Sequence, residues 1–259
     1  MKPLREFNQK IRFVLTDIDD TITTKGQLTN KAYHALWKLK QNNFYVIPVT
    51  GRPAGWCDMI ARFWPVDAVI GENGGLYYRY LQNKMIRWNF HADPEIQKNK
   101  NKLEQIKNEV LKEIPASRVS ADQFSRVHDL AIDFCEDIPK LSEPDIQKIV
   151  SLFKKHGATA KVSSIHVNGW FGDFNKVTTA KLVLKKEFGL DDQQILDQCV
   201  YIGDSPNDEP LFESFKHTFG VANIKEFSSQ MKHLPQFVST FDSGDGFCEI
   251  VDQIIANNL

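Results

Sequence analysis

Closely spaced cysteine pairs are missing from this sequence. Only four cysteines occur in 259 residues, and no two of them form a CxxC pair: Cys57, Cys135, Cys199 and Cys248. This spacing fits neither a zinc knuckle nor a disulfide framework. A reducing compartment is the simplest location for such a chain, and we expect a cytoplasmic protein.

An excess of charge of one sign is missing too. Lys and Arg total 32 against 33 for Asp and Glu, which leaves a formal net charge of −1. Such a balance provides no positive field to steer the chain onto a phosphate backbone or an anionic lipid surface. The lysine-rich segment 98–112 also carries Glu104 and Glu109, a mixture typical of a solvated helix face. We expect no nucleic-acid partner.

Long apolar segments are absent as well. The apolar run from Ile11 to Leu15 is interrupted by Arg12 and is too short for a signal peptide. No other segment approaches the roughly 20 apolar residues that a membrane-spanning helix needs, so no membrane partner is expected. With 42% hydrophobic and 25% charged residues, the composition is that of an ordinary globular protein. It does not indicate an oligomeric state, and a monomer is our default.

What the sequence does contain is an alternation of strands and helices. The runs 13–15, 44–50 and the start of 67–75 are rich in β-branched and aromatic residues, and segments with helical spacing separate them. From about residue 176 the same rhythm returns and continues to a last helix. This pattern predicts an α/β fold with a Rossmann-like, open, mostly parallel sheet flanked by helices.

The middle of the chain interrupts this rhythm. After about Tyr80, a strongly polar helix precedes a short strand at 130–134, a helix at 142–156 and short strands near 159–167. We therefore predict an inserted α+β domain at residues 83–168. The body is then discontinuous and comprises residues 1–82 and 169–259.

Reactive side chains follow three of the predicted body strands. Asp17 and Asp19 come after the first strand, Thr50 after the second, and Asp204 after the apolar run CVYIG. Because ligands of open α/β sheets bind at the carboxyl ends of the strands, these residues should meet in one crevice. Carboxylates that close together require a hard cation, and Mg²⁺ is the natural choice. Asp208, in the helical turn that follows, is placed to brace that cation.

These residues resemble the motifs of the haloacid dehalogenase-like phosphohydrolases. DIDDT at 17–21 matches the pattern DxDx[TV], VTGR at 49–52 carries the second-motif threonine, and Lys176 and GDSPND at 203–208 match the third and fourth motifs. The predicted insert lies between the second and third motifs, as in the C2-capped branch, subfamily IIB. That branch holds the Cof-like and sucrose-phosphatase-like phosphatases.

The resemblance implies a Mg²⁺-dependent phosphatase that works through an aspartyl-phosphate. In such an enzyme Asp17 attacks phosphorus, while Asp19 protonates the leaving alkoxide and then activates water. Thr50 and Lys176 stabilise the phosphoryl group in transfer. The expected substrate is a small phosphorylated metabolite, with sugar phosphates as the leading class and the insert as the part that discriminates among them.

The same resemblance implies binding residues. For the metal they are the side chains of Asp17 and Asp204, the backbone carbonyl of Asp19, and Asp208 behind them. For the substrate we expect contacts from six residues: Thr50, Gly51, Arg52, Asn73, Asn168 and Lys176. For three of these a purely structural role stays open, because Arg52 can pair locally, Asn73 suits a tight turn, and Asn168 can pack the insert against the body.

Two other functions stay open on the sequence alone. Phosphosugar mutases similar to phosphomannomutase also carry two aspartates, a capped body and an ENG-like turn, as in GENGG at 71–75, but their fourth motif is longer than GDSPND. Phosphorylation-sensing receiver modules also gather aspartates, a threonine and a lysine at strand ends. They are about half this length and lack a counterpart of Asp19.

Overall fold

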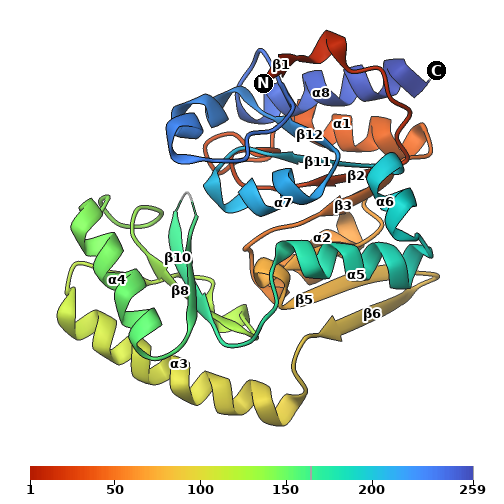
Figure 1. The fold of residues 1–259 in the computed structure, drawn as a ribbon. Helices are drawn as coiled ribbons and strands as arrows, with labels where there is room; N and C mark the ends of the chain where they lie inside the picture. The colour runs from red at the N-terminus through yellow and green to blue at the C-terminus, as the bar shows by residue number, and fades with distance from the viewer. Residues whose placement is uncertain (164, 259) are drawn as a thin grey trace.

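A six-stranded parallel sheet forms the centre of the larger of two lobes (Figure 1). The computed structural model describes residues 1–163 and 165–258. In spatial order the strands are β1 (Lys2–Pro3), β13 (Phe237–Val238), β12 (His217–Gly220), β11 (Cys199–Gly203), β2 (Phe13–Thr16) and β3 (Tyr45–Pro48). This sheet, with helices on both faces, confirms the predicted α/β class.

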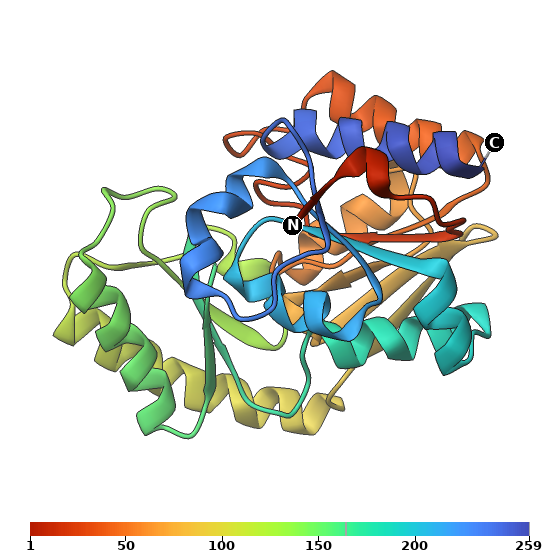
Figure 2. The same cartoon turned by 45° about the horizontal axis from the view of Figure 1, so that its top comes forward.

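The central strands are buried on both faces. Along β2, Val14 packs into one apolar core, whereas Phe13 and Leu15 pack into the core on the opposite face. The helices of this lobe are α1 (Asn30–Gln41), α2 (Ala54–Phe63), α5 (Lys176–Phe188), α6 (Asp192–Gln198), α7 (Glu209–Ser214) and α8 (Ser243–Asn258). The helices α1, α2 and α8 contribute to the first core, and α5, α6 and α7 to the second. Figures 1 and 2 show α1 and α8 side by side.

Local sequence signals set the limits of these helices. The Thr29 side chain accepts a hydrogen bond from the Ala32 backbone N–H, which caps α1. The α5 helix begins with a capping box between Asn175 and Thr178 and ends at Gly189, whose φ is +72°. Because of this cap, Lys176 is the first residue of α5 at the edge of the sheet.

An antiparallel three-stranded sheet continues beyond β3. It consists of β4 (Val69–Gly71), β5 (Leu76–Leu81) and β6 (Lys84–Asn89). A parallel bridge between Val49 and Ile70 joins it to the end of β3. The sequence did not indicate the hairpin β5–β6, because β6 is largely exposed or half-exposed and shows no apolar alternation.

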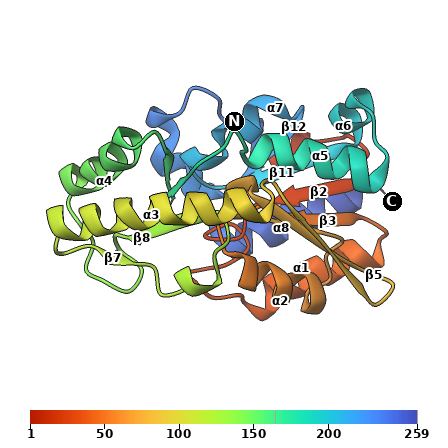
Figure 3. The same cartoon turned by 90° about the horizontal axis from the view of Figure 1, so that it is seen from below.

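The smaller lobe contains an antiparallel sheet with two helices on one face (Figures 1 and 3). Its strands, in order, are β7 (Arg118–Val119), β8 (Asp129–Asp133), β10 (His166–Trp170) and β9 (Thr159–Val162), and its helices are α3 (Asp93–Glu113) and α4 (Glu143–Lys155). Val167 packs into the core under these helices, and a Cβ at Gly169 would lie 2.1 Å from the Phe153 ring of α4. The alternate residues of β10 therefore face away from the helices.

We propose that the smaller lobe is the predicted insert, residues 83–168. The limits at 82 and 168 fall at the turn of the hairpin β5–β6 and within β10. Strand β10, a central strand of the smaller lobe's sheet, continues past residue 168 to Trp170. None of the helices in the described ranges is both long enough and apolar enough to cross a membrane.

Candidate active site

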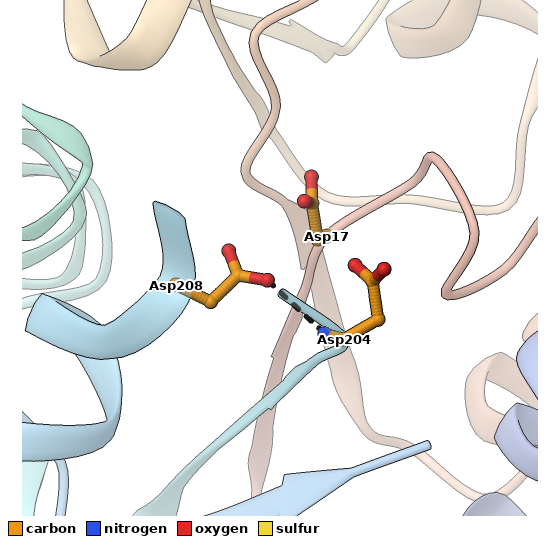
Figure 4. A group of neighbouring side chains, drawn as sticks. All are labelled: Asp17, Asp204 and Asp208. Atoms are coloured by element: carbon orange, nitrogen blue, oxygen red, sulfur yellow. Dashed lines mark hydrogen bonds between the residues drawn. The ribbon is translucent and has the colours of Figure 1, made fainter. Parts of the chain in front are cut away.

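Three aspartates meet at the carboxyl ends of the two central strands. Thr16 at the end of β2 pairs with Ile202 of β11, so Asp17 and Asp204 extend from neighbouring strand ends. Asp208 reaches in from the short helical turn that follows β11, as Figure 4 shows. Carboxylate oxygens of the three residues lie within 4.8 Å of one another. The sequence prediction that these strand ends converge is thus matched by the geometry.

Hydrogen bonds occupy both carboxylate oxygens of Asp208. Its Oδ1 accepts hydrogen bonds from Lys176 Nζ at 2.9 Å and from the Tyr201 hydroxyl at 2.6 Å, and its Oδ2 accepts one from the Asp204 backbone N–H at 3.1 Å. A Cβ at Gly203 would lie 2.5 Å from Asp208 Oδ2, so the glycine of GDSPND makes this approach possible. Asp208 therefore orients its neighbours and offers few lone pairs to a metal.

Lys176 is the buried cation of this cluster. Its Nζ lies 3.1 Å from Asp17 Oδ2 and 2.9 Å from Asp208 Oδ1. Burial by itself lowers the pKa of Lys176, but the two carboxylates raise it above its ordinary value, so the side chain stays charged. The start of α5 is held by the turn before β5, where Gly74 has a φ of +104° and a Cβ would lie 2.3 Å from the Asn175 carbonyl oxygen.

Negative charge exceeds positive charge in this cluster. Burial raises the pKa of Asp17 to about 7, although Lys176 opposes this rise. Burial and the neighbouring Asp208 also raise the pKa of Asp204 well above its ordinary value. Carboxylate oxygens arranged in this way fit a hard divalent cation, which would offset both the burial and the mutual repulsion. Asp17 and Asp204 are the two carboxylates placed to hold it.

The turn after β3 lies beside this cluster. Pro48 pairs with Thr16 in register, so Thr50, two residues later, lies at the neighbouring strand end. Thr50 is fully buried, and its Oγ1 accepts a hydrogen bond from the Arg52 backbone N–H at 3.0 Å. This bond leaves the hydroxyl hydrogen of Thr50 able to donate to another acceptor.

Arg52 joins the second aspartate of the first motif to the smaller lobe. Its Nε donates to Asp19 Oδ2 at 3.0 Å and its Nη2 donates to Asp19 Oδ1 at 2.8 Å. Its Nη1 donates to Glu136 of the smaller lobe at 3.0 Å. The guanidinium also lies 4.4 Å from the centre of the Trp56 ring. In this arrangement both Asp19 oxygens are engaged, and an acid role for Asp19 requires the Asp19–Arg52 pair to open.

Asn73, Gly51 and Asn168 lie around this centre. A Cβ at Gly51 would lie 3.4 Å from the Asn73 amide, and Asn73 Nδ2 is buried without a hydrogen-bond partner among the described residues. Asn73 and Lys176 line a cavity of about 430 Å³ that extends to Trp170 of the smaller lobe. Asn168 donates a hydrogen bond to Asp129 at 2.9 Å and lines a much smaller cavity beside Asp19. Asn168 is therefore held by a hydrogen bond within the smaller lobe and also lies over the site.

A buried carboxylate that the sequence analysis did not single out ties the two lobes together. Glu72 is fully buried, and its Oε1 accepts hydrogen bonds from the backbone N–H groups of Ala54, at 3.0 Å, and Val127, at 2.9 Å. Its Oε2 accepts a further bond from the His128 N–H at 2.6 Å. Nearby, Arg126 donates to the Gly51 carbonyl at 3.0 Å. The smaller lobe thus holds the turn that presents Thr50.

Burial predicts an unusual pH dependence for Glu72. Burial, followed by the charge of Asp129, raises the pKa of Glu72 from 4.5 to about 7, and each pKa unit is worth about 1.4 kcal/mol. A pKa raised on folding gives stability that is present below pH 4.5 and lost as the pH rises to about 7. Between pH 5 and 7.5, the wild type should therefore lose ~2 kcal/mol more stability than Glu72→Gln.

Urea unfolding of both proteins at the two pH values, in the presence of a chelator, measures this difference. Other carboxylates also make the free energy of unfolding depend on pH in both proteins, so the quantity to compare is the difference between the two pH-dependent changes. Equal changes for wild type and Glu72→Gln would contradict the raised pKa.

Comparison with known proteins finds similarity to hydrolases. A family model described as haloacid dehalogenase-like hydrolase matches residues 14–124, which contain the first two motifs. The chain is also similar to the phosphoglycolate phosphatase of Nitrosopumilus maritimus (strain SCM1). The two are 26% identical over 252 residues, which cover 95% of this chain and 96% of that protein.

Solved structures share the fold over nearly the full length. A protein of Thermoplasma acidophilum, 0175, superposes with a TM-score of 0.73 at 18% identity and covers 95% of this chain and 99% of its own. The sucrose-phosphatase from Synechocystis sp. PCC6803, solved with sucrose and phosphate, superposes with a TM-score of 0.64 at 15% identity, covering 95% and 98%. At these identities the likeness concerns the fold.

Proposed function

We propose that this chain, which belongs to the haloacid dehalogenase-like hydrolases and is a phosphatase, hydrolyses a small phosphorylated metabolite through an aspartyl-phosphate on Asp17. The substrate class that we propose is a sugar phosphate. The observation that carries the proposal is the contact of Lys176 with both Asp17 and Asp208 beside Asp204. This arrangement provides a nucleophile, a fixed positive charge and a place for a cation within one buried cluster.

In the first step Asp17 is the nucleophile. One of its carboxylate oxygens attacks phosphorus in line, and the bond from phosphorus to the alcohol oxygen breaks. Negative charge on the phosphoryl oxygens is met by the Lys176 ammonium and the Thr50 hydroxyl. Once its pairing with Arg52 opens, Asp19 takes up a proton from solvent and gives this proton to the departing alkoxide.

In the second step a water molecule releases phosphate. Asp19, now without its proton, takes a proton from the water that attacks the phosphoryl group on Asp17. This attack restores the Asp17 carboxylate, and inorganic phosphate leaves. The Lys176 ammonium faces the site in both steps, because Asp208 and the start of α5 hold it in place.

Mg²⁺ is the cation that we propose for this cluster, held by the side chains of Asp17 and Asp204 and by the backbone carbonyl of Asp19. When bound, it supplies positive charge that lowers the repulsion between the carboxylate and the phosphate. Asp208 lies behind these ligands and orients Asp204 through its backbone N–H.

Mg²⁺ should stabilise the folded protein measurably. At a concentration about 100 times the dissociation constant, binding adds about 2.7 kcal/mol, which is expected to raise the melting temperature by about 5 °C or more. Asp204→Asn removes one carboxylate ligand and should lose most of this shift. Melting curves with Mg²⁺ and with a chelator, recorded for both proteins, provide the comparison. The same shift in both would exclude Asp204 as a ligand.

The decisive test of the proposed function is phosphate release. Purified protein with Mg²⁺ is incubated with phosphorylated sugars, polyols, nucleotides and cofactors, beside Asp17→Asn as the inactive control. Release from sugar phosphates by the wild type alone supports the proposal. No release from any compound, with isomerisation of a sugar phosphate in the presence of a sugar bisphosphate, would instead establish a mutase.

A further inference from the structure

A cavity between the lobes lies on the side of Asp19. It has a volume of about 290 Å³, and Asp19, Arg52 and Glu136 line it. This volume is at the lower end of the range for small-molecule sites. Because Asp19 protonates the leaving oxygen in the proposed reaction, the leaving alcohol occupies the space beside it. The groups around this cavity therefore select among alcohols.

Glu136 is the acidic group that the smaller lobe contributes to this space. Its Oε1 accepts a hydrogen bond from Arg52 Nη1 at 3.0 Å, and its Oε2 lies 2.9 Å from His166 Nε2. These two neighbours, His166 first, lower the pKa of Glu136 to about 2, so it is ionised at neutral pH. The side chain keeps 29% of its surface exposed. It is therefore fixed in place yet accessible from the cavity.

The arginines near Asp19 are already neutralised by carboxylates. Arg52 contacts Asp19 and Glu136, and Asp122 lies 3.7 Å from its Nη1. The Arg126 guanidinium contacts Asp122 and Asp129, each at 3.0 Å. Both guanidinium charges are therefore already paired with carboxylates and attract a further anion only weakly.

One lysine on the cavity wall is the exception. Lys25 lies in an exposed turn between Thr24 and Gln27 and forms no ion pair with another described residue. Its charge is open to water, which screens it strongly. The inner wall of the cavity, where Asp19, Arg52 and Glu136 lie, carries two carboxylates against one guanidinium, and Asp20 adds a third carboxylate to the cavity lining.

We propose that Glu136 determines leaving-group specificity: the site accepts phosphate esters of uncharged, hydroxyl-rich alcohols and rejects esters that carry a carboxylate or a second phosphate on the leaving group. This inference rests on the proposed function. An ionised carboxylate accepts hydrogen bonds from hydroxyl groups, and it repels a second anion at short range where water is excluded. An alcohol with several hydroxyl groups therefore satisfies Glu136, whereas a hydroxy acid leaves two carboxylates face to face.

A matched pair of substrates tests this inference. Glycerol 3-phosphate and 3-phosphoglycerate share a three-carbon skeleton and differ at one end, a hydroxymethyl group against a carboxylate. We expect the wild type to favour glycerol 3-phosphate in kcat/KM by at least about tenfold, and Glu136→Gln to reduce this ratio by a similar factor. Both compounds are also measured as competitive inhibitors of p-nitrophenyl phosphate hydrolysis, so that the ratio is obtained even where turnover is slow.

Controls separate this inference from the proposed function. Lys25→Met should leave the ratio unchanged, because the selection is assigned to the inner wall. Equal use of the two substrates by the wild type, or a ratio that Glu136→Gln does not alter, would overturn the role of Glu136 while hydrolysis of p-nitrophenyl phosphate still supports the phosphatase. The role of Glu136 would also be overturned if Lys25→Met lost the preference for glycerol 3-phosphate while Glu136→Gln kept it. Hydrolysis of p-nitrophenyl phosphate that persists in Asp17→Asn would instead refute the proposed mechanism.

Discussion

Replacing Asp17 by asparagine is expected to lower kcat by about four orders of magnitude or more, the usual result of removing a covalent nucleophile. The amide is nearly the same size as the carboxylate, so the Lys176 and Asp208 side chains keep their positions. The variant should also be at least as stable as the wild type without metal, because one buried negative charge has been removed. Phosphate release in single-turnover and steady-state assays measures the first effect, and urea unfolding measures the second.

Asp252→Asn is a matched control for this substitution. Asp252 lies on α8, at the exposed side of the larger lobe, where it pairs with Lys38. Its replacement should leave kcat unchanged, because exposed ion pairs contribute little. If Asp17→Asn retained more than about a hundredth of the wild-type rate, a covalent intermediate on Asp17 would be excluded.

Replacing Lys176 by methionine should affect activity and stability together. The phosphoryl oxygens lose the fixed charge that faces them, and a fall in kcat of about three orders of magnitude is expected. Asp17 and Asp208 also lose their buried counter-charge, and breaking a buried pair in this way costs about 3–5 kcal/mol. Saturating Mg²⁺ should restore part of the stability but not the activity. Steady-state kinetics and urea unfolding with and without Mg²⁺ measure these effects.

Lys185→Met, in the last turn of the same helix, is the control for Lys176→Met. Lys185 is 45% exposed and pairs with Asp192, so its loss should change stability by less than about 1 kcal/mol. Equal stability of the two variants would show that the aspartate cluster does not depend on Lys176 for its charge balance.

The larger lobe was predictable because its strands are buried on both faces. A run such as Phe13 to Thr16 is apolar at every position before its polar end, and this pattern is specific for a central parallel strand. The hairpin β5–β6 was not predicted, because the side chains of β6 point largely to solvent and give the sequence no apolar period. Strand pairing there depends on β5 and on the turn at Gln82 and Asn83, both of which have positive φ.

The aspartate cluster was predictable for a different reason. Its members follow strand ends directly, so their convergence depends only on parallel pairing between neighbouring strands. Glu136 and Glu72 gave no such signal, because their partners lie on the other lobe. The spacing of residues along the sequence does not indicate how two lobes pack against each other.

The central position of β2 has a consequence for the order in which the protein is made. Phe13 emerges from the ribosome early, yet its partner Cys199 in β11 follows only after the whole smaller lobe has been synthesised. The smaller lobe pairs its strands within one continuous stretch of chain, and such local contacts form faster than distant ones. During translation the edge of β2 that faces β11 therefore stays unpaired until β11 has been synthesised. The catalytic centre is completed late in synthesis, because Asp204 and Asp208 follow β11.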